Sequence, residues 1–417
     1  MSEEMRRNRI LDAAEQRFLV DGFERSSVDA IAADARVSKR EIYRDWPSKS
    51  DLFAAVALRT FPEIEVAPIA LDGGANAEPM LEQLALQLLD IFVADRNRSF
   101  FRTSIAATRH FPDLISEMHQ RRTTAWAGYG ACFEQLGAAG IIDAPDAAKM
   151  ALRFGSLAVE GARFLFGSSP PSAPARRQYA HAVVHVFFNG WESAQKALGQ
   201  DSIAPELRLP VAVDLPDEIM PLPTMRMPAE RFTALREALW NEFLINGYPR
   251  ANMGRAAASA GVSKATVYRQ FVNKEGVFSY LASDAIIALQ QVAWRDQKPS
   301  GEAFEQDLKA LMHAMLEAHV RPEMLAFQRM LVEEATIFPQ LARAFYDTQL
   351  INAKHALTQL CRHYGKPEPT EIFVRLFYVL VTFGSRFLMT LPAPAAEVRT
   401  AIICEAMTVF TRGVAKA

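Results

Sequence analysis

The chain has 417 residues, of which 50% are hydrophobic and 23% are charged, and its formal net charge is −2. This length exceeds one ordinary domain and suits two to four, and the composition is that of a globular protein. The small negative charge excludes a general attraction to nucleic acid, so any surface that binds it must be a local basic patch.

Cysteine usage and the N-terminus bear on the compartment. Cys132, Cys361 and Cys404 lie far apart without CxxC spacing, which argues against a zinc cluster or a disulfide framework and fits a reducing environment. Residues 1–9 carry charges but no apolar core of a signal peptide. No apolar run approaches the roughly 18 residues that a membrane helix needs. We therefore expect a cytoplasmic protein without a membrane partner.

The first predicted elements are three short helices. Apolar residues at helical spacing predict a helix over residues 10–20, which Gly22 ends with a left-handed cap. A second helix follows a serine cap, and Arg36 occupies the turn after it. Ser38 then stands where a third helix needs its N-cap.

Longer helices follow, and no strand-like alternation competes with them, so the predicted fold class is all-α. Proline and glycine mark a loop over residues 62–78. The predicted body helices cover residues 80–95, 100–108, 113–136, 146–166 and 176–198. Residues 199–228 hold six prolines and predict an extended linker.

A second unit repeats the first. Residues 37–53 align without a gap with residues 262–278, and the offset is constant (247 − 22 = 225 for the glycines, 278 − 53 = 225 for the phenylalanines). Such self-similarity indicates two copies of one architecture. The predicted body helices of the second unit cover residues 283–294, 302–317, 323–336, 339–363, 371–391 and 395–414.

The repeat continues beyond these segments. Phe111 matches Phe338 at an offset of 227, and Arg163 matches Arg386 at an offset of 223. Loop insertions produce such small changes of offset. Two complete units are therefore fused head to tail.

Both copies resemble the DNA-binding segment of the tetracycline-repressor (TetR) family, whose hallmark is Val-Ser-x-x-x-Val/Ile-Tyr-x-x-Phe-x-x-Lys-x-x-Leu-Phe. In the second copy Ser263 caps the helix, while Val267 and Phe271 share its apolar face. The resemblance implies that each unit has a helix-turn-helix head and a helical body for ligand binding and dimerisation. The predicted heads are residues 1–61 and 229–284, the bodies 62–198 and 285–417, and the linker 199–228.

The resemblance also implies site residues. In the family the motif tyrosine and the downstream lysine contact phosphates, which gives that role to Tyr43, Lys49, Tyr268 and Lys274. Other polar residues of the two recognition helices are candidates for base or phosphate contacts, with arginine to guanine or glutamine to adenine as natural pairings. The predicted DNA-binding residues are Ser38, Lys39, Arg40, Tyr43, Arg44, Lys49, Ser263, Lys264, Thr266, Tyr268, Arg269, Gln270 and Lys274.

The two recognition helices differ in charge. Glu41 and Asp45 stand where the second copy has Thr266 and Gln270. Carboxylates repel phosphate, unless Glu41 accepts a hydrogen bond from a cytosine amino group. We predict an operator with two unlike half-sites about one helical turn apart. The alternative is a degenerate first head that only positions the protein.

The resemblance also implies an arrangement like that of a homodimer, in which the last two helices of each unit form a four-helix interface. Here those helices are residues 146–166 with 176–198, and 371–391 with 395–414. Fusion makes this pairing independent of concentration. We expect a monomer that forms an internal pseudo-dimer, with a dimer of such chains as the alternative.

The resemblance further implies a cavity in each body for a small-molecule effector, hydrophobic or amphipathic if the lining is mainly apolar. Aromatic and methionine stripes fit either such a lining or an ordinary core. Arg163 and Arg386 either bind an anionic group or pair within the bodies. The candidate residues are Phe101, Phe111, Trp126, Phe154, Arg163, Phe327, Met330, Phe338, Tyr346 and Arg386.

His181 and His185 have the i, i+4 spacing that brings two imidazoles to one metal. Without an obvious third ligand, we expect a structural role and no metal. No phosphate-binding loop, catalytic triad or carboxylate pair stands out, so neither a catalytic residue nor a cofactor is predicted and the chain is not expected to be an enzyme.

These observations favour a ligand-responsive transcriptional regulator, a repressor, that binds double-stranded DNA through both heads and is released by its effector. The alternative is a ligand-binding or protein-interaction module whose heads do not read DNA. Only the first predicts salt-dependent, sequence-specific binding.

Overall fold

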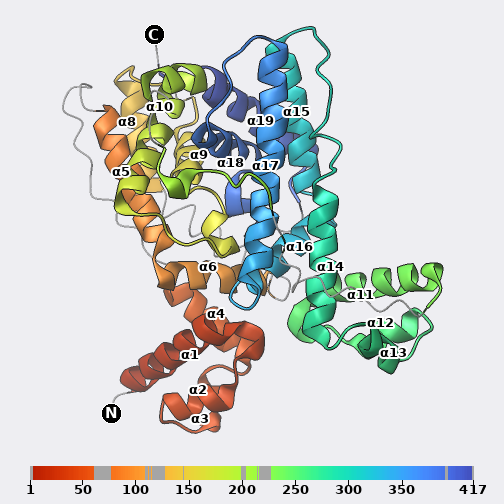
Figure 1. The fold of residues 1–417 in the computed structure, drawn as a ribbon. Coiled ribbons are helices and arrows are strands. Elements are labelled where there is room, and N and C mark those ends of the chain that lie inside the picture. The colour runs from red at the N-terminus through yellow and green to blue at the C-terminus, as the bar shows by residue number, and fades with distance from the viewer. Residues whose placement is uncertain are drawn as a thin grey trace.

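A computed structural model describes residues 3–60, 77–108, 111, 114, 127–143, 145–198, 203–213, 215, 227–389 and 393–415. The described residues form α-helices, short 3-10 helices and one isolated antiparallel bridge, which confirms the all-α prediction. Figure 1 shows a large helical body with two small helical heads at one end of it.

Unit one supplies head one and body one. Head one consists of α1 (Glu3–Arg25), α2 (Val28–Asp34), α3 (Lys39–Asp45) and α4 (Lys49–Thr60). Body one consists of α5 (Ala77–Val93), α6 (Asp95–Ala107), α8 (Ala127–Ala138), α9 (Ala147–Ala158), the 3-10 helix η1 (Arg163–Phe166) and α10 (Ala173–Leu198). The first helix begins before residue 10, where we predicted it to start, and therefore brings Arg6 into head one.

Unit two repeats this order. Head two consists of α11 (Ala229–Arg250), α12 (Met253–Ser259), α13 (Lys264–Gln270) and α14 (Lys274–Leu289). Body two consists of α15 (Phe304–His319), α16 (Pro322–Glu333), α17 (Pro339–His363), α18 (Glu371–Thr382), the 3-10 helix η4 (Gly384–Met389) and α19 (Ala396–Thr411). Because α14 continues past residue 284, head two and body two share one helix, and the separate helix predicted over 283–294 is wrong.

The two long helices predicted over residues 146–166 and 371–391 are each broken. α9 ends before Glu160 and Gly161, and α18 ends before Phe383 and Gly384, and all four residues have positive φ. The two breaks face one another so closely that a Cβ on Gly384 would lie 2.7 Å from the Cα of Gly161. Close backbone approach between the units, which a sequence pattern does not report, ends both helices.

A matched arginine holds each break. Arg102 on α6 donates to the carbonyl oxygens of Phe164 and Leu165, both at 3.0 Å. Arg329 on α16 donates to the carbonyl oxygens of Phe387 and Leu388 at 3.1 and 2.9 Å. These side chains satisfy carbonyl groups that a continuous helix would have bonded internally.

The four-helix interface predicted between the units is present and is formed by α9, α10, α18 and α19. Trp191 of α10 stacks on Phe410 of α19, with ring centroids 5.6 Å apart. Arg375 of α18 pairs with Glu160 across the interface at 2.8 Å, and both side chains are at most 2% exposed. A large apolar contact with a buried ion pair makes the chain an internal pseudo-dimer.

Part of the predicted linker belongs to this interface. Residues 203–213 include the 3-10 helix η2 (Pro205–Leu207), and Leu207 is fully buried. Arg375 donates to the carbonyl oxygens of Leu207 and Arg208 at 2.9 and 2.7 Å. The described part of the linker is therefore packed against α18.

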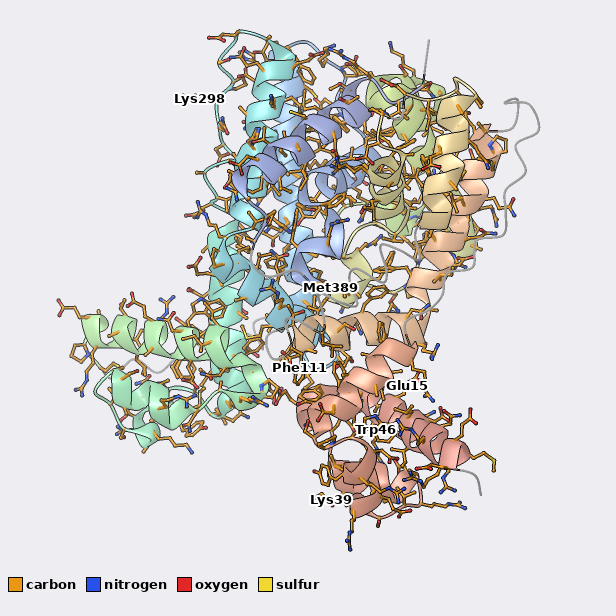
Figure 2. All side chains as sticks on the ribbon, turned by 180° about the vertical axis from the view of Figure 1, so that it is seen from behind. Glu15, Lys39, Trp46, Phe111, Lys298 and Met389 are labelled. Carbon is orange, nitrogen blue, oxygen red and sulfur yellow. The ribbon has the colours of Figure 1, made fainter. Side chains whose placement is uncertain are left out.

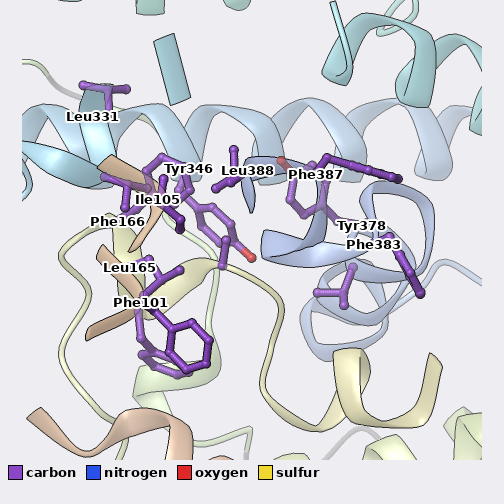
Figure 3. Close-up of a cluster of buried hydrophobic side chains, with 14 of the residues drawn as sticks. Phe101, Ile105, Leu165, Phe166, Leu331, Tyr346, Tyr378, Phe383, Phe387 and Leu388 are labelled. Atoms are coloured by element: carbon purple, nitrogen blue, oxygen red, sulfur yellow. The ribbon is translucent and has the colours of Figure 1, made fainter. Parts of the chain in front are cut away.

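The units also share a hydrophobic core between the four-helix interface and the heads. Figure 3 shows Phe166 of η1 beside Tyr346 of α17, and their rings stack with centroids 5.7 Å apart.

Within the described residues, one stretch, Glu371–Met389, has the length and apolar composition of a membrane span, which our prediction had missed. Because it is 94% buried, its apolar character is accounted for by its central place in this core.

Candidate nucleic-acid interface and cavities

Each head is built around a short helix entered by a left-handed turn. Ser38 and Ser263 are the N-caps of α3 and α13, as predicted, and each accepts a hydrogen bond from the backbone three residues later. The turn residues Arg36 and Gly261 have φ of 51° and 66°. Glycine adopts this conformation freely, whereas a side chain costs about 1 kcal/mol there.

Basic and aromatic side chains cover the outer face of α3. Lys39, Arg40, Tyr43 and Arg44 are all exposed, and Figure 2 shows Lys39 at the tip of head one that points away from the body. Lys39 Nζ lies 3.0 Å from a carboxylate oxygen of Asp29, and this hydrogen bond raises the pKa of Lys39. The predicted residues of head one, apart from Lys49, thus form one solvent-facing basic surface.

The two carboxylates of α3 serve the head's own structure. Asp45 is paired with Arg6 of α1 at 2.7 Å, and the two side chains are 6% and 9% exposed. Glu41 accepts hydrogen bonds from the backbone N–H and the hydroxyl of Ser38, at 2.7 and 2.8 Å, and these bonds lower its pKa. Because Asp45 is almost fully buried and paired with Arg6, it presents little charge to a ligand outside the head.

Head two presents a face without carboxylates on α13. The Thr266 hydroxyl lies 3.0 Å from the Ser263 hydroxyl and accepts a 3.0 Å hydrogen bond from Arg269. Lys264 Nζ lies 5.8 Å from the centre of the Tyr268 ring. The amide oxygen of Gln270 is buried without a hydrogen-bond partner among the described residues.

The two motif lysines hold the end of the first helix in each head. Lys49 Nζ donates to the carbonyl oxygens of Phe23 and Ser26 at 2.8 and 3.2 Å. Lys274 Nζ donates to the carbonyl oxygen of Pro249 at 3.0 Å. Burial lowers the pKa of both lysines. Each lysine thus has a structural role inside its head, and the contact of Lys49 and Lys274 with phosphate stays a prediction.

Two predicted pocket residues instead join heads to bodies. Phe111 contacts the Phe23 and Phe53 rings of head one, with centroids 4.9 and 5.9 Å apart, and Figure 2 shows it at this junction. In unit two, the matched Phe338 contacts Tyr248 and Phe278 at 5.1 and 4.8 Å. The same kind of aromatic contact therefore joins head and body in both units.

Most other predicted pocket residues lie in packed regions. Those buried in the core are Phe101, Phe154, Phe327, Met330 and Tyr346. Trp126 lies outside the described residues. Arg163 pairs with Glu160 at 3.0 Å and donates to the carbonyl oxygen of Glu206, so its pairing is internal.

Arg386 lines a cleft between the units, with a volume of about 570 Å³. The cleft is lined by residues of α9, η4 and α19 and by Phe383, and it includes Arg153. Arg153 pairs with Glu405 at 2.8 Å. The Arg386 guanidinium, by contrast, has no side-chain hydrogen bond or ion pair in the described part of the chain. It lies over the Phe383 ring. Burial, and then the charge of Arg153, lower the pKa of Arg386.

Sequence reasoning missed Arg153, although a charge inside the apolar pattern of α9 was a usable signal.

Sequence reasoning also missed a smaller cavity of about 100 Å³ in body two, lined in part by Met315, His319 and Tyr378. Both ring nitrogens of His319 are buried without a hydrogen-bond partner within the described ranges. Burial lowers the pKa of His319 to about 4.

Salt bridges connect head one to unit two. Glu24 of head one pairs with Arg250 of head two at 2.5 Å. Arg25 of head one pairs at 3.1 Å with Glu334, a buried residue that follows α16. The heads are thus linked to each other and not only to their own bodies.

Family models match both units. The model of bacterial regulatory proteins of the tetR family matches residues 10–56 and 235–281. The model of the C-terminal domain of AefR-like transcriptional repressors matches residues 79–192 and 306–364. Uncharacterized HTH-type transcriptional regulators of Mycobacterium tuberculosis (strain ATCC 25618 / H37Rv) and Mycobacterium bovis are 45% identical over 47 residues, which are 11% of this chain and 23% of each relative.

Solved structures of similar proteins each cover less than half of the chain. A TetR transcriptional regulator from Agrobacterium tumefaciens is 26% identical, with 43% of this chain and 92% of that chain covered and a TM-score of 0.36. A TetR family transcriptional regulator from Pseudomonas syringae pv. tomato is 24% identical over 44% of this chain and 95% of that chain, with a TM-score of 0.36. The Flavonoid-responsive Regulator FrrA is 25% identical over 47% and 95%, with a TM-score of 0.37.

Both family models are found twice, in the same order, and the matched segments coincide with the repeated heads and bodies. The chain therefore belongs to the TetR family of transcriptional regulators and consists of two tandem TetR units.

Proposed function

We propose that the protein is a ligand-responsive repressor that binds an operator with two unlike half-sites, one for each head. The observation that carries this proposal is the difference between two equally well-formed recognition helices. Each is N-capped and exposes a polar face, but α3 presents Lys39, Arg40 and Arg44 whereas α13 presents Lys264 and Arg269. Different donors select different base edges.

The degenerate-head alternative loses its main support through the Arg6–Asp45 pair. A carboxylate that is 6% exposed and neutralised by a guanidinium adds little repulsion toward phosphate. Glu41 remains near the DNA-facing surface, and its second oxygen can accept from a cytosine amino group. We propose that both heads read DNA in the cytoplasm and that the chain has no enzymatic activity.

The fused interface supports one chain per operator. The resemblance to the family implies a four-helix interface between two subunits, and here α9, α10, α18 and α19 form that interface within one chain. A monomer therefore carries two heads, which is the valence that a two-half-site operator requires. We propose that the heads are residues 1–61 and 229–284 and the bodies residues 62–198 and 285–417, joined by residues 199–228, with α14 crossing the boundary at residue 284.

In vitro selection of duplex DNA on the full chain, with the mass of the complex determined on the selected site, tests this proposal. We expect an asymmetric site bound by one chain, with binding that weakens steeply as salt rises. Arg44→Ala should relax preference in one half-site and Arg269→Ala in the other, each at a cost of about 1–3 kcal/mol. Arg362→Ala, an exposed arginine of body two, is the control.

Three results would contradict it. A palindrome bound by two chains would mean that one head dominates. Unchanged binding by both Tyr43→Ala and Tyr268→Ala would show that neither recognition helix lies on DNA. The absence of an enriched sequence at near-physiological salt would favour a module that does not read DNA.

We further propose that the effector occupies the cleft between the units. Its volume of about 570 Å³ lies in the range of small-molecule sites, which is roughly 300–1,000 Å³. Apolar side chains beside the Arg386 guanidinium, which has no side-chain partner among the described residues, suit an amphipathic anion, such as a carboxylic acid with an apolar tail. Because the cleft borders both α9 and α19, an occupant affects how the units pack, which gives it a route to the heads.

Fluorescence titration with a dansyl-labelled medium-chain fatty acid tests the cleft. Arg386→Met should weaken binding of the acid about tenfold or more, the equivalent of ~1.4 kcal/mol, and leave binding of its methyl ester unchanged. Arg362→Met is the control. Equal loss for acid and ester would show that Arg386 acts through packing alone, and saturating acid without effect on DNA affinity would remove the regulatory role.

A further inference from the structure

Three potential metal ligands meet on the outer side of body one. Glu82 of α5 and His181 and His185 of α10 each place a ligand atom within 4.8 Å of the others. His181 Nδ1 lies 2.5 Å from Glu82 Oε1, and the two imidazole centroids are 4.4 Å apart. The third ligand, which the sequence did not show, comes from a different helix.

A second carboxylate lies near the same imidazoles. Glu78 precedes Glu82 by one turn of α5, and both carboxylates act electrostatically on His185. The pKa of His185 nevertheless lies below its ordinary value, first because of burial and then because of the neighbouring His181. Glu78 is therefore a further carboxylate within electrostatic reach of the cluster.

The cluster is a feature of unit one alone. The repeat offsets of 227 for α5 and 223 for α10 place Lys309, Cys404 and Thr408 at the matching positions of unit two. A lysine beside a single cysteine does not form a comparable site. The three ligands are therefore not part of the framework that the two units share.

We propose that Glu82, His181 and His185 bind one divalent transition-metal ion of the zinc class. Two imidazoles and a carboxylate are a ligand set that Zn²⁺ and its neighbours accept, with a further position left for water or for Glu78. All three side chains are half-buried, so the ion would be held between α5 and α10 with access to solvent.

Binding requires a small local rearrangement. Ligand atoms around a four-coordinate zinc are separated by roughly 3.3 Å, given Zn–N and Zn–O distances of about 2.0–2.2 Å. The 2.5 Å separation of His181 Nδ1 from Glu82 Oε1 must therefore widen. The ion replaces one short contact by a bridge between two helices.

Cobalt(II) titration of the chelator-treated full chain tests the site, since its visible absorption reports the coordination sphere. We expect one equivalent of Co²⁺ to bind and Zn²⁺ to displace it. His181→Ala and His185→Ala should each weaken binding by at least roughly 100-fold, because loss of a ligand costs more than loss of a group that orients one. The double variant should show no absorption change.

His313→Ala is the matched control, because His313 is also half-buried and lies on α15, the helix that corresponds to α5. Circular dichroism verifies that each variant folds, and Zn²⁺ should raise the melting temperature of the parent and the control but not of the double variant. Equal Co²⁺ binding by parent and double variant, or none by the parent up to millimolar metal, would overturn the proposal. Neither result depends on DNA or on the effector.

Discussion

Head one and head two enter their recognition helices through the same left-handed turn and serine cap but distribute charge differently on those helices. In head one, Asp45 is withdrawn into a pair with Arg6, and Glu41 is occupied by its capping box. In head two, Thr266 and Gln270 stand at those positions. The comparison teaches that a recognition helix can carry carboxylates when the head supplies their partners.

The bodies differ in a similar way. Body two encloses a small cavity beside His319, and the repeat offset of 227 places Phe92 at the matching position of body one. Body one carries the histidine–glutamate cluster that body two lacks. The arginines that hold the broken helices are matched, as Arg102 and Arg329 show, whereas the residues at this cavity and in this cluster differ between the units.

The largest expected effect concerns the pair that crosses the units. Arg375→Met leaves Glu160 with Arg163 as its remaining partner and removes the donor to the carbonyl oxygens of Leu207 and Arg208, and breaking such a buried pair costs about 3–5 kcal/mol. Equilibrium unfolding in urea should show this loss of stability. Arg362→Met, which removes an exposed pair with Glu368, should change the stability far less, because solvent screens an exposed ion pair. Equal effects would mean that the buried pair does not hold the units together.

A pH-dependent effect follows from His319. The unfolded chain binds a proton there below pH 6.5, whereas the native protein does so only near pH 4, so stability falls as pH decreases between these values. The difference corresponds to about 3 kcal/mol. His319→Phe, which introduces the matching residue of unit one, should flatten this dependence in unfolding measured from pH 7 to 4. His363→Phe, at an exposed histidine, should leave the slope unchanged, and a slope that survives in His319→Phe would assign it elsewhere.

The close approach of the units predicts an intermediate effect. Gly384→Ala adds a Cβ at 2.7 Å from the Cα of Gly161, in addition to the strain of a positive φ. Gly365→Ala carries the same strain, since its φ is 62°, but meets nothing within 4 Å. We expect Gly384→Ala to lower the free energy of unfolding by about 2 kcal/mol more than Gly365→Ala. Thermal unfolding measures the difference, which would vanish if the units were not in contact here.

The smallest effect tests the comparison of the heads. Asp45→Asn keeps an acceptor for Arg6 but removes the charge, and we expect a loss of about 1–1.5 kcal/mol in the stability of head one. Asp34→Asn, which alters an exposed pair with Arg17 in the same head, should destabilise head one less, because solvent screens that pair. Native-state hydrogen exchange within α1 and α3 resolves the two. A larger effect from Asp34→Asn would reverse our assignment of the buried carboxylate.

Local sequence patterns predicted most of the fold. The repeat of residues 37–53 at 262–278, the serine caps and the helical periodicity predicted an all-α pair of units, and α17 has the predicted bounds, residues 339–363. These features depend on contacts within a few residues of one another, so the amino-acid pattern alone determines them.

Contacts between distant segments decided the rest. Four features depend on residues that are far apart in the chain. They are the breaks after α9 and α18, the pairing of Asp45 with Arg6, the contacts of Phe111 and Phe338 with the heads, and the cluster of Glu82 with two histidines. A buried arginine or a short backbone approach leaves no periodic signal, because its partner belongs to another helix. The sequence by itself determined two tandem helical units with their caps and turns. Only tertiary packing decided which of their charged and aromatic side chains face solvent or a cleft and which hold the molecule together.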